Sequence, residues 1–121
     1  MRKKALIIEE NDSVRHLLSS FLAKEFEAMS VRSGFEAMIC LHNGFIPDII
    51  VNSKGKSTTE GLQFLFNLNC SGMFGSIPVV VIGVPDTEEE EQSFRQSGAV
   101  DYFRKPFNPG ALQNRILQIL S

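Results

Sequence analysis

The sequence predicts an α/β domain, a doubly wound parallel sheet with helices on both faces. Its 121 residues are 43% hydrophobic, which suits one compact domain with a core and leaves too little chain for two. Apolar runs of strand length alternate with segments whose apolar residues recur at helical spacing. Such alternation implies right-handed crossovers, which build a parallel sheet. We therefore treat residues 1–121 as a single domain.

The first strand and helix are predicted by an apolar run and the helical repeat that follows it. The run Lys4 to Ile8 ends in an acidic pair, Glu9 and Glu10. Asn11 or Asp12 can cap the next helix, because a side-chain oxygen there accepts from the first-turn amides. The apolar residues that define the buried face of this helix are Val14, Leu17, Leu18, Phe21 and Leu22.

The second strand and helix have a weaker signal. Ala28 to Val31 is a short apolar strand, and Ser33 with Gly34 leads into a helix that Gly44 ends. The apolar side of this helix is expected to use Phe35, Met38, Ile39 and Leu41.

The third strand is the centre of the expected sheet. Ile49 to Val51 is a β-branched run between turn residues, which is typical of a strand buried on both faces. It leaves through Asn52, Ser53 and Lys54, at the edge where ligands bind in open α/β sheets. The next helix is predicted by Leu62, Leu65, Phe66 and Leu68.

The fourth strand precedes an acidic helix. Pro78 to Ile82 is a buried run, and Asp86 is expected to cap a helix that Gly98 ends. Glutamates in its first turn suit the positive end of the helix dipole. Phe94 is its only large apolar residue, so we expect this helix to be weakly anchored and mobile.

The last strand and helix complete the alternation. Val100 to Phe103 is a short strand, and Asn108 with Pro109 starts the final helix as cap and first-turn proline. Together the elements predict a three-layer fold with a five-stranded parallel sheet in the flavodoxin-like order 2-1-3-4-5 and five helices. This order gathers the acidic pair, the exit of the third strand, Gly83 and Lys105 around one crevice.

Composition excludes several classes of function. The net charge of −2 gives no basic surface for nucleic acid, and no apolar run is long enough to span a membrane. Cys40 and Cys70 lie in helical patterns without histidines at metal spacing, so both are expected to be reduced thiols. The short apolar stretch after Met1 does not have the form of a signal peptide, and a cytoplasmic location is expected.

The chain resembles the receiver domain of bacterial two-component response regulators over essentially its whole length. GAVDYFRKPF, from Gly98, resembles that family's signature of small, acidic and aromatic residues followed by lysine, proline and phenylalanine. LIIEENDSVRHLL, from Leu6, resembles its first strand, acidic pair and first helix. PDII, from Pro47, and EGLQFL, from Glu60, match as well. The resemblance implies a module of phosphorelay signal transduction with no enzymatic activity of its own.

Two departures from the family pattern affect the implied site. In the family, the acidic pair and an aspartate at the end of the third strand hold Mg²⁺, and that aspartate accepts a phosphoryl group from a histidine kinase. Six positions after Pro47 and eight before Gly61, Ser53 stands in its place, flanked by Asn52. Five positions after Pro78, Gly83 replaces the switch serine or threonine.

These departures predict a degenerate site. A serine cannot form an acyl phosphate, and its hydroxyl is a weak nucleophile until a base activates it. No cofactor is expected, and at most weak Mg²⁺ binding at Glu9 and Glu10. Lys105, which contacts the phosphoryl group in the family, is expected to pair with one of these glutamates as a structural contact. Lys54 is expected to add a second positive charge at the same crevice, next to Ser53.

We expect a pseudo-receiver that acts by protein contact. Without a hydroxyl at Gly83, the aromatic switch position Tyr102 loses its coupling to the acceptor. The surface formed by the fourth helix, fifth strand and fifth helix stays available to a histidine kinase, another signalling protein or a second copy of the chain. Two alternatives remain open, an atypical phosphoacceptor such as Ser53 and a small-ligand sensor that uses the acidic crevice.

Overall fold

The computed structural model describes residues 2–54, 58–84 and 87–121. It contains a five-stranded parallel sheet in the order β2-β1-β3-β4-β5, so the predicted strand order is confirmed. The strands are β1 (Lys4–Ile8), β2 (Glu27–Val31), β3 (Ile49–Ser53), β4 (Val79–Gly83) and β5 (Asp101–Arg104). The helices are α1 (Asp12–Leu22), α2 (Gly34–His42), α3 (Thr58–Asn69), α4 (Glu88–Gln96) and α5 (Pro109–Leu120).

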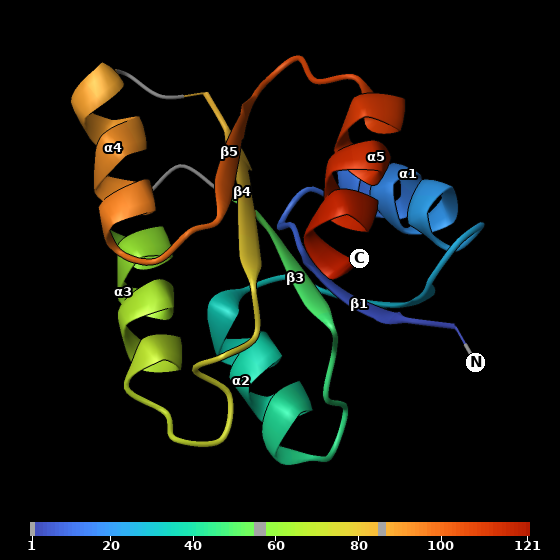
Figure 1. Cartoon of the computed structure of the whole chain (residues 1–121), viewed down its shortest axis with the longest axis horizontal. Helices are drawn as coiled ribbons and strands as arrows, with labels where there is room; N and C mark the ends of the chain where they lie inside the picture. The colour runs from blue at the N-terminus through green and yellow to red at the C-terminus, as the bar shows by residue number, and fades with distance from the viewer. Residues whose placement is uncertain (1, 55–57, 85–86) are drawn as a thin grey trace.

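The helices form two layers on the sheet. Helices α1 and α5 cover one face, and α2, α3 and α4 cover the other (Figure 1). Strands β3 and β4 are buried at every position, as their continuous apolar runs predict. Because side chains alternate between the two faces of a strand, Ile50 faces α2 and α3, whereas Val51 faces α1 and α5.

The buried faces of α2 and α3 differ from those predicted. In α2 the buried residues are Ala37 and Leu41, while Phe35 is 77% exposed and Ile39 is 46% exposed. A helix of this length can bury only one stripe, and its apolar residues exceed that stripe. In α3 the prediction named Phe66, which is 61% exposed, and missed the buried Phe64. In α1, Leu17 was also assigned to the buried face but is 62% exposed.

Helix α4 begins one residue later than the sequence suggested. Thr87 is its cap, and the Thr87 hydroxyl accepts a hydrogen bond from the Glu90 amide at 3.1 Å. The predicted cap, Asp86, lies outside the described residues. Phe94, predicted to be the only large apolar residue of this helix, is its one buried apolar residue within the described chain. The expected mobility of α4 stays a prediction.

The parallel register brings the polar strand ends to one edge of the sheet. Ile8 pairs with Asn52, Ser53 with Ile82, and β4 continues the ladder to β5 at Gly83. The residues that leave β1, β3, β4 and β5 therefore meet at the carboxyl edge, where the sequence predicts the site.

Candidate functional site

Glu9 is the centre of a buried polar cluster at the carboxyl edge of the sheet. It follows β1 and is 3% exposed. Its Oε1 accepts a hydrogen bond from Ser53 Oγ at 2.5 Å and one from Lys105 Nζ at 3.3 Å. Its Oε2 accepts from the Asn11 amide at 2.9 Å. We call these three side chains the Glu9–Ser53–Lys105 cluster.

The strands fix the geometry of this cluster. Ser53 lies on the same face of β3 as Val51, toward α1 and α5. Lys105 follows β5, and its amide donates to the Gly83 carbonyl at 2.9 Å, which directs the chain past the end of β4. Because a buried carboxylate is costly without partners, the three donors to Glu9 offset the cost of its burial. The predicted structural pairing of Lys105 is therefore with Glu9.

The acidic pair is divided between two environments. Glu10 is exposed and lies outside the cluster. It lines a small polar cavity of about 70 Å³ together with Arg32, Asn52 and Glu60. Asn52 is 4% exposed, and its Nδ2 has no hydrogen-bond partner among the described residues. The sequence alone does not distinguish the two glutamates, but in the structure Glu9 bonds Ser53 and Lys105 whereas Glu10 lines the polar cavity.

The donor set fits a divalent cation poorly. Both carboxylate oxygens of Glu9 already accept hydrogen bonds, one of them from a cation. Ser53 supplies a neutral hydroxyl where a hard cation favours a carboxylate. Across residues 2–54, 58–84 and 87–121, no group of three or more histidine, cysteine, aspartate or glutamate side chains is arranged to hold a metal.

Gly83 is packed against two side chains that fill the space beside it. A Cβ at this position would lie 2.7 Å from Tyr102 Oη and 3.1 Å from Lys54 Cβ. Tyr102 is 6% exposed and packs on Phe94 with ring centroids 5.7 Å apart. The ring at this position therefore points inward.

Lys54 does not take the position predicted for it. Its ammonium group forms an ion pair with Glu90 of α4 instead of adding charge beside Ser53. This position follows from how the chain leaves β3. The Lys54 amide donates a hydrogen bond to the Ile82 carbonyl at 2.6 Å, and the side chain then runs along the end of β4 toward α4.

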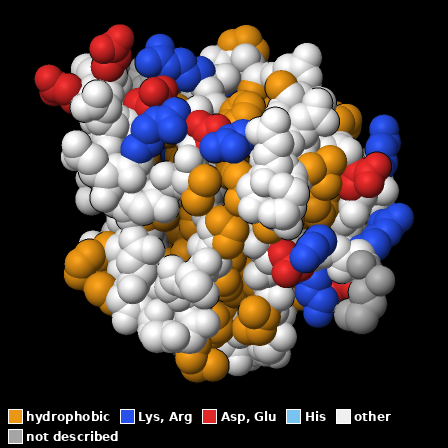
Figure 2. All heavy atoms as spheres, in the orientation of Figure 1, with side chains coloured by type: hydrophobic (Ala, Val, Ile, Leu, Met, Phe, Trp, Pro, Cys, Tyr) orange, Lys and Arg blue, Asp and Glu red, His pale blue; other side chains and the backbone are white. Residues whose placement is uncertain are grey.

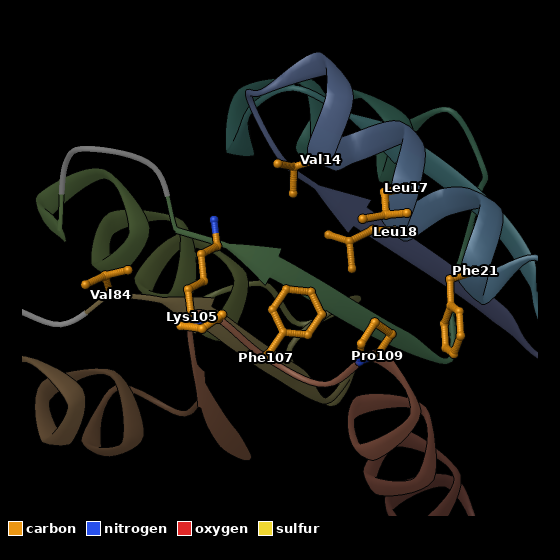
Figure 3. A pocket seen from close by; sticks show the side chains of 9 residues that line it. Val14, Leu17, Leu18, Phe21, Val84, Lys105, Phe107 and Pro109 are labelled. Carbon is orange, nitrogen blue, oxygen red and sulfur yellow. The ribbon is translucent and has the colours of Figure 1, made fainter.

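An apolar groove of about 470 Å³ adjoins the cluster. In Figure 3, Val14, Leu17 and Leu18 of α1 face Lys105 and Phe107, which follow β5. The stem of Lys105 lines this groove while its ammonium group bonds Glu9. Sequence reasoning missed the groove, because it assigned Leu17 to the core although it is 62% exposed.

A charge network joins α4, β5 and α5 on the surface. Asp101 accepts hydrogen bonds from Arg95 at 3.1 Å and from Arg115 at 2.8 Å. Arg104 forms an ion pair with Glu91 at 2.9 Å. Figure 2 shows basic and acidic side chains intermixed over this region. Burial raises the pKa of Asp101, but hydrogen bonds from Arg115, the Tyr102 amide and Arg95 outweigh it, so its pKa lies below the usual value.

The helices are all too short or too polar to cross a bilayer, as far as the described residues go.

Comparison with known proteins places this geometry in a family. A family model described as the response regulator receiver domain matches residues 5–117. The KDP operon transcriptional regulatory protein KdpE of Escherichia coli is 28% identical over 115 residues, which cover 92% of this chain and 48% of that protein. The phosphate regulon transcriptional regulatory protein PhoB of Escherichia coli is 26% identical over 120 residues, which cover 99% of this chain and 52% of that protein. The chain thus spans about half the length of these curated relatives.

A solved structure agrees with the fold. The chemotaxis response regulator of Vibrio cholerae superposes with a TM-score of 0.86 at 21% identity, covering 99% of this chain and 100% of that one. At this identity the likeness concerns the fold, and it bears out the arrangement of five parallel strands with helices on both faces.

Proposed function

The chain belongs to the response regulator receiver domain family of two-component signalling, and on that premise we propose that it acts by protein contact, independently of aspartyl phosphorylation. The observation that carries this proposal is the Glu9–Ser53–Lys105 cluster. An acyl phosphate needs a carboxylate nucleophile, and the position at the end of β3 offers a serine. The Ser53 hydroxyl is held by Glu9, and Lys105 is paired with the same oxygen.

The environment of Gly83 supports the same proposal. A phosphoryl group can shift a conformational equilibrium only through an interaction that differs between the two states. Gly83 has no hydroxyl to provide that interaction, and the space beside it is filled by Tyr102 and Lys54. The inward position of Tyr102 is thus independent of any event at Ser53.

The face formed by α4, β5 and α5 is the proposed contact surface. It carries charges of both signs, and Val100, which directly precedes β5, is an apolar residue that is 40% exposed there. A mixture of this kind is typical of transient protein interfaces. A histidine kinase, another signalling protein or a second copy of the chain are the proposed partners.

A second candidate function is phosphorylation of Ser53 itself. The observation in its favour is the 2.5 Å hydrogen bond from Ser53 Oγ to Glu9, which is the geometry of a hydroxyl beside a general base. Against it, the same Glu9 oxygen that accepts from Ser53 is already paired with the Lys105 ammonium group. The third candidate, a small-ligand sensor, would use the polar cavity of about 70 Å³ beside Glu10, because Glu9 is already bonded to Ser53 and Lys105.

Intact mass after incubation with a small-molecule phosphodonor and Mg²⁺ separates these functions. We expect no phosphoryl adduct on the native chain and an adduct on a Ser53→Asp variant, because only the variant has a carboxylate at the end of β3. Ser53→Ala is the matched control for background labelling. An adduct on the native chain that Ser53→Ala abolishes would establish Ser53 as an acceptor and refute the proposal.

A further inference from the structure

A buried ion pair connects the exit of β3 with α4. The Lys54 side chain is 6% exposed and that of Glu90 is 8% exposed. Lys54 Nζ also lies 3.5 Å from the Val84 carbonyl, and the Thr58 hydroxyl at the start of α3 donates to the same Glu90 oxygen. The pair therefore joins three segments, namely the β3 exit, the start of α3 and the first turn of α4.

Both charged side chains of the pair are buried, which is unusual for lysine and glutamate. Removing both from water is costly, and attraction between them offsets this cost only with good geometry and further hydrogen bonds. Glu90 has that support from Thr58 and Lys54. Buried pairs of this kind contribute most clearly by selecting one arrangement over its alternatives. The arrangement selected here is the position of α4 beside β5 and α3.

Besides this pair, helix α4 is held by one buried apolar side chain and by partly exposed ion pairs of Glu91 and Arg95. Phe94, near its end, is the one apolar residue of α4 that is buried in the described part of the chain. Glu90 lies in the first turn, so the buried contacts of the helix are the ion pair at its start and the apolar contact of Phe94 near its end. Of the other acidic residues in its first turn, Glu88 and Glu89 are exposed and Glu91 pairs with Arg104.

Gly83 is what makes room for this pair. The stem of Lys54 passes beside Gly83, where an added Cβ would lie 3.1 Å from Lys54 Cβ and 3.3 Å from Lys54 Cδ. Tyr102 Oη would lie 2.7 Å from the same Cβ. The loss of the side chain at position 83, the inward Tyr102 and the buried Lys54 are thus one packing arrangement.

We propose that Lys54 and Glu90 form an internal latch that holds α4 against the β3 exit and keeps the face of α4, β5 and α5 in a single arrangement. The inference rests on the proposed function in one respect, that this face is the contact surface. The latch makes that surface permanent, since the charges that position α4 belong to the chain itself. It follows that the latch residues, and not the Glu9–Ser53–Lys105 cluster, control the mobility of α4.

Hydrogen exchange of the α4 amides tests the latch. Glu90→Gln removes the charge with little change in shape and leaves Lys54 buried without its counter-charge. We expect the amides of α4 to exchange about tenfold faster in this variant, because local opening becomes easier. Glu89→Gln is the matched control, since it removes the same charge from the same turn at an exposed position, and its exchange should equal that of the native chain. Equal rates in Glu90→Gln and Glu89→Gln would overturn the latch.

A second variant tests whether the two side chains act as a pair. Lys54→Met keeps the apolar stem beside Gly83 and removes the ammonium group. In the double variant Lys54→Met with Glu90→Gln, the α4 amides should exchange no faster than in the faster-exchanging single variant, because the effects of removing two partners of one ion pair do not add. If the two effects multiply, the side chains act independently and the latch is refuted. These outcomes are separate from phosphoryl labelling of the native chain, which would refute the proposed function and leave the exchange result unaffected.

Discussion

Single residues decide the chemistry of this site. Glu9 and Glu10 are adjacent and chemically identical, yet Glu9 is buried with three hydrogen-bond donors and Glu10 is exposed. The difference arises at the end of β1, where the chain turns into α1 and directs one carboxylate toward Ser53. A single side chain thus neutralises Lys105 and holds the hydroxyl at the acceptor position.

Replacement of Gly83 by serine, the residue type typical of this position in the family, is expected to destabilise the protein. The new Cβ would lie 2.7 Å from Tyr102 Oη, so Tyr102 or Lys54 must move. Overpacking of this kind costs about 1–3 kcal/mol in the free energy of unfolding. Urea unfolding measures it, with Gly72→Ser as the control, because a Cβ at Gly72 meets no atom within 4 Å. Equal stability of the two variants would show that Gly83 is not required by packing.

The sequence predicts much of the site at this scale. Ser53 and Gly83 could be placed by counting from Pro47, Gly61 and Pro78, because strand length and register fix such positions. The sequence limits the partner of Lys105 to Glu9 or Glu10. It does not show which of the two forms the ion pair, because that depends on the conformation of the turn after β1. Lys54 was misplaced because its partner, Glu90, is 36 residues away in a helix whose position no local pattern gives.

At the scale of elements, the charge network around Asp101 joins α4 and α5 to the start of β5. Arg95 of α4 and Arg115 of α5 both donate to the Asp101 carboxylate, whose side chain is 20% exposed. These bonds stabilise the ionised form and outweigh the effect of burial, so the pKa of Asp101 lies below that of the unfolded chain. The network therefore contributes stability that depends on pH.

Asp101→Asn is expected to lower the free energy of unfolding by about 1–3 kcal/mol at neutral pH, the range for hydrogen bonds to charged groups. Because the folded pKa is depressed, the contribution is present above the unfolded pKa of about 3.9 and is lost as the pH falls through the folded pKa. Urea unfolding of both proteins between pH 7 and pH 2.5 should show the difference closing in acid. A difference that persists unchanged at the lowest pH would contradict this account.

The sequence predicts the elements better than their buried faces. All five strands and five helices lie where strand-length runs and helical repeats place them. The faces of α2 and α3 were assigned wrongly at Phe35, Ile39 and Phe66, because these short helices carry more apolar residues than one stripe can bury. Hydrophobic spacing identifies a helix, but the sheet beneath it decides which side packs.

At the scale of the whole molecule, the fold separates the inherited site from the proposed contact surface. The Glu9–Ser53–Lys105 cluster lies on the side of β3 that faces α1 and α5, together with the apolar groove of Figure 3. The Lys54–Glu90 latch lies toward α4. This division is what the proposed function requires, because residues away from the acceptor position hold the contact surface.

The central claim is tested most directly by amide chemical shifts of the native chain in a nitrogen-15 correlation spectrum. The protein with Mg²⁺ alone provides the reference, and a small-molecule phosphodonor is then added. We predict that the amides of α4, β5 and the start of α5 keep their shifts, because no group at Ser53 can pass a signal to Tyr102 through Gly83. Specific shift changes on that face after addition of the phosphodonor would contradict the account and identify the chain as a phosphorylation-dependent switch.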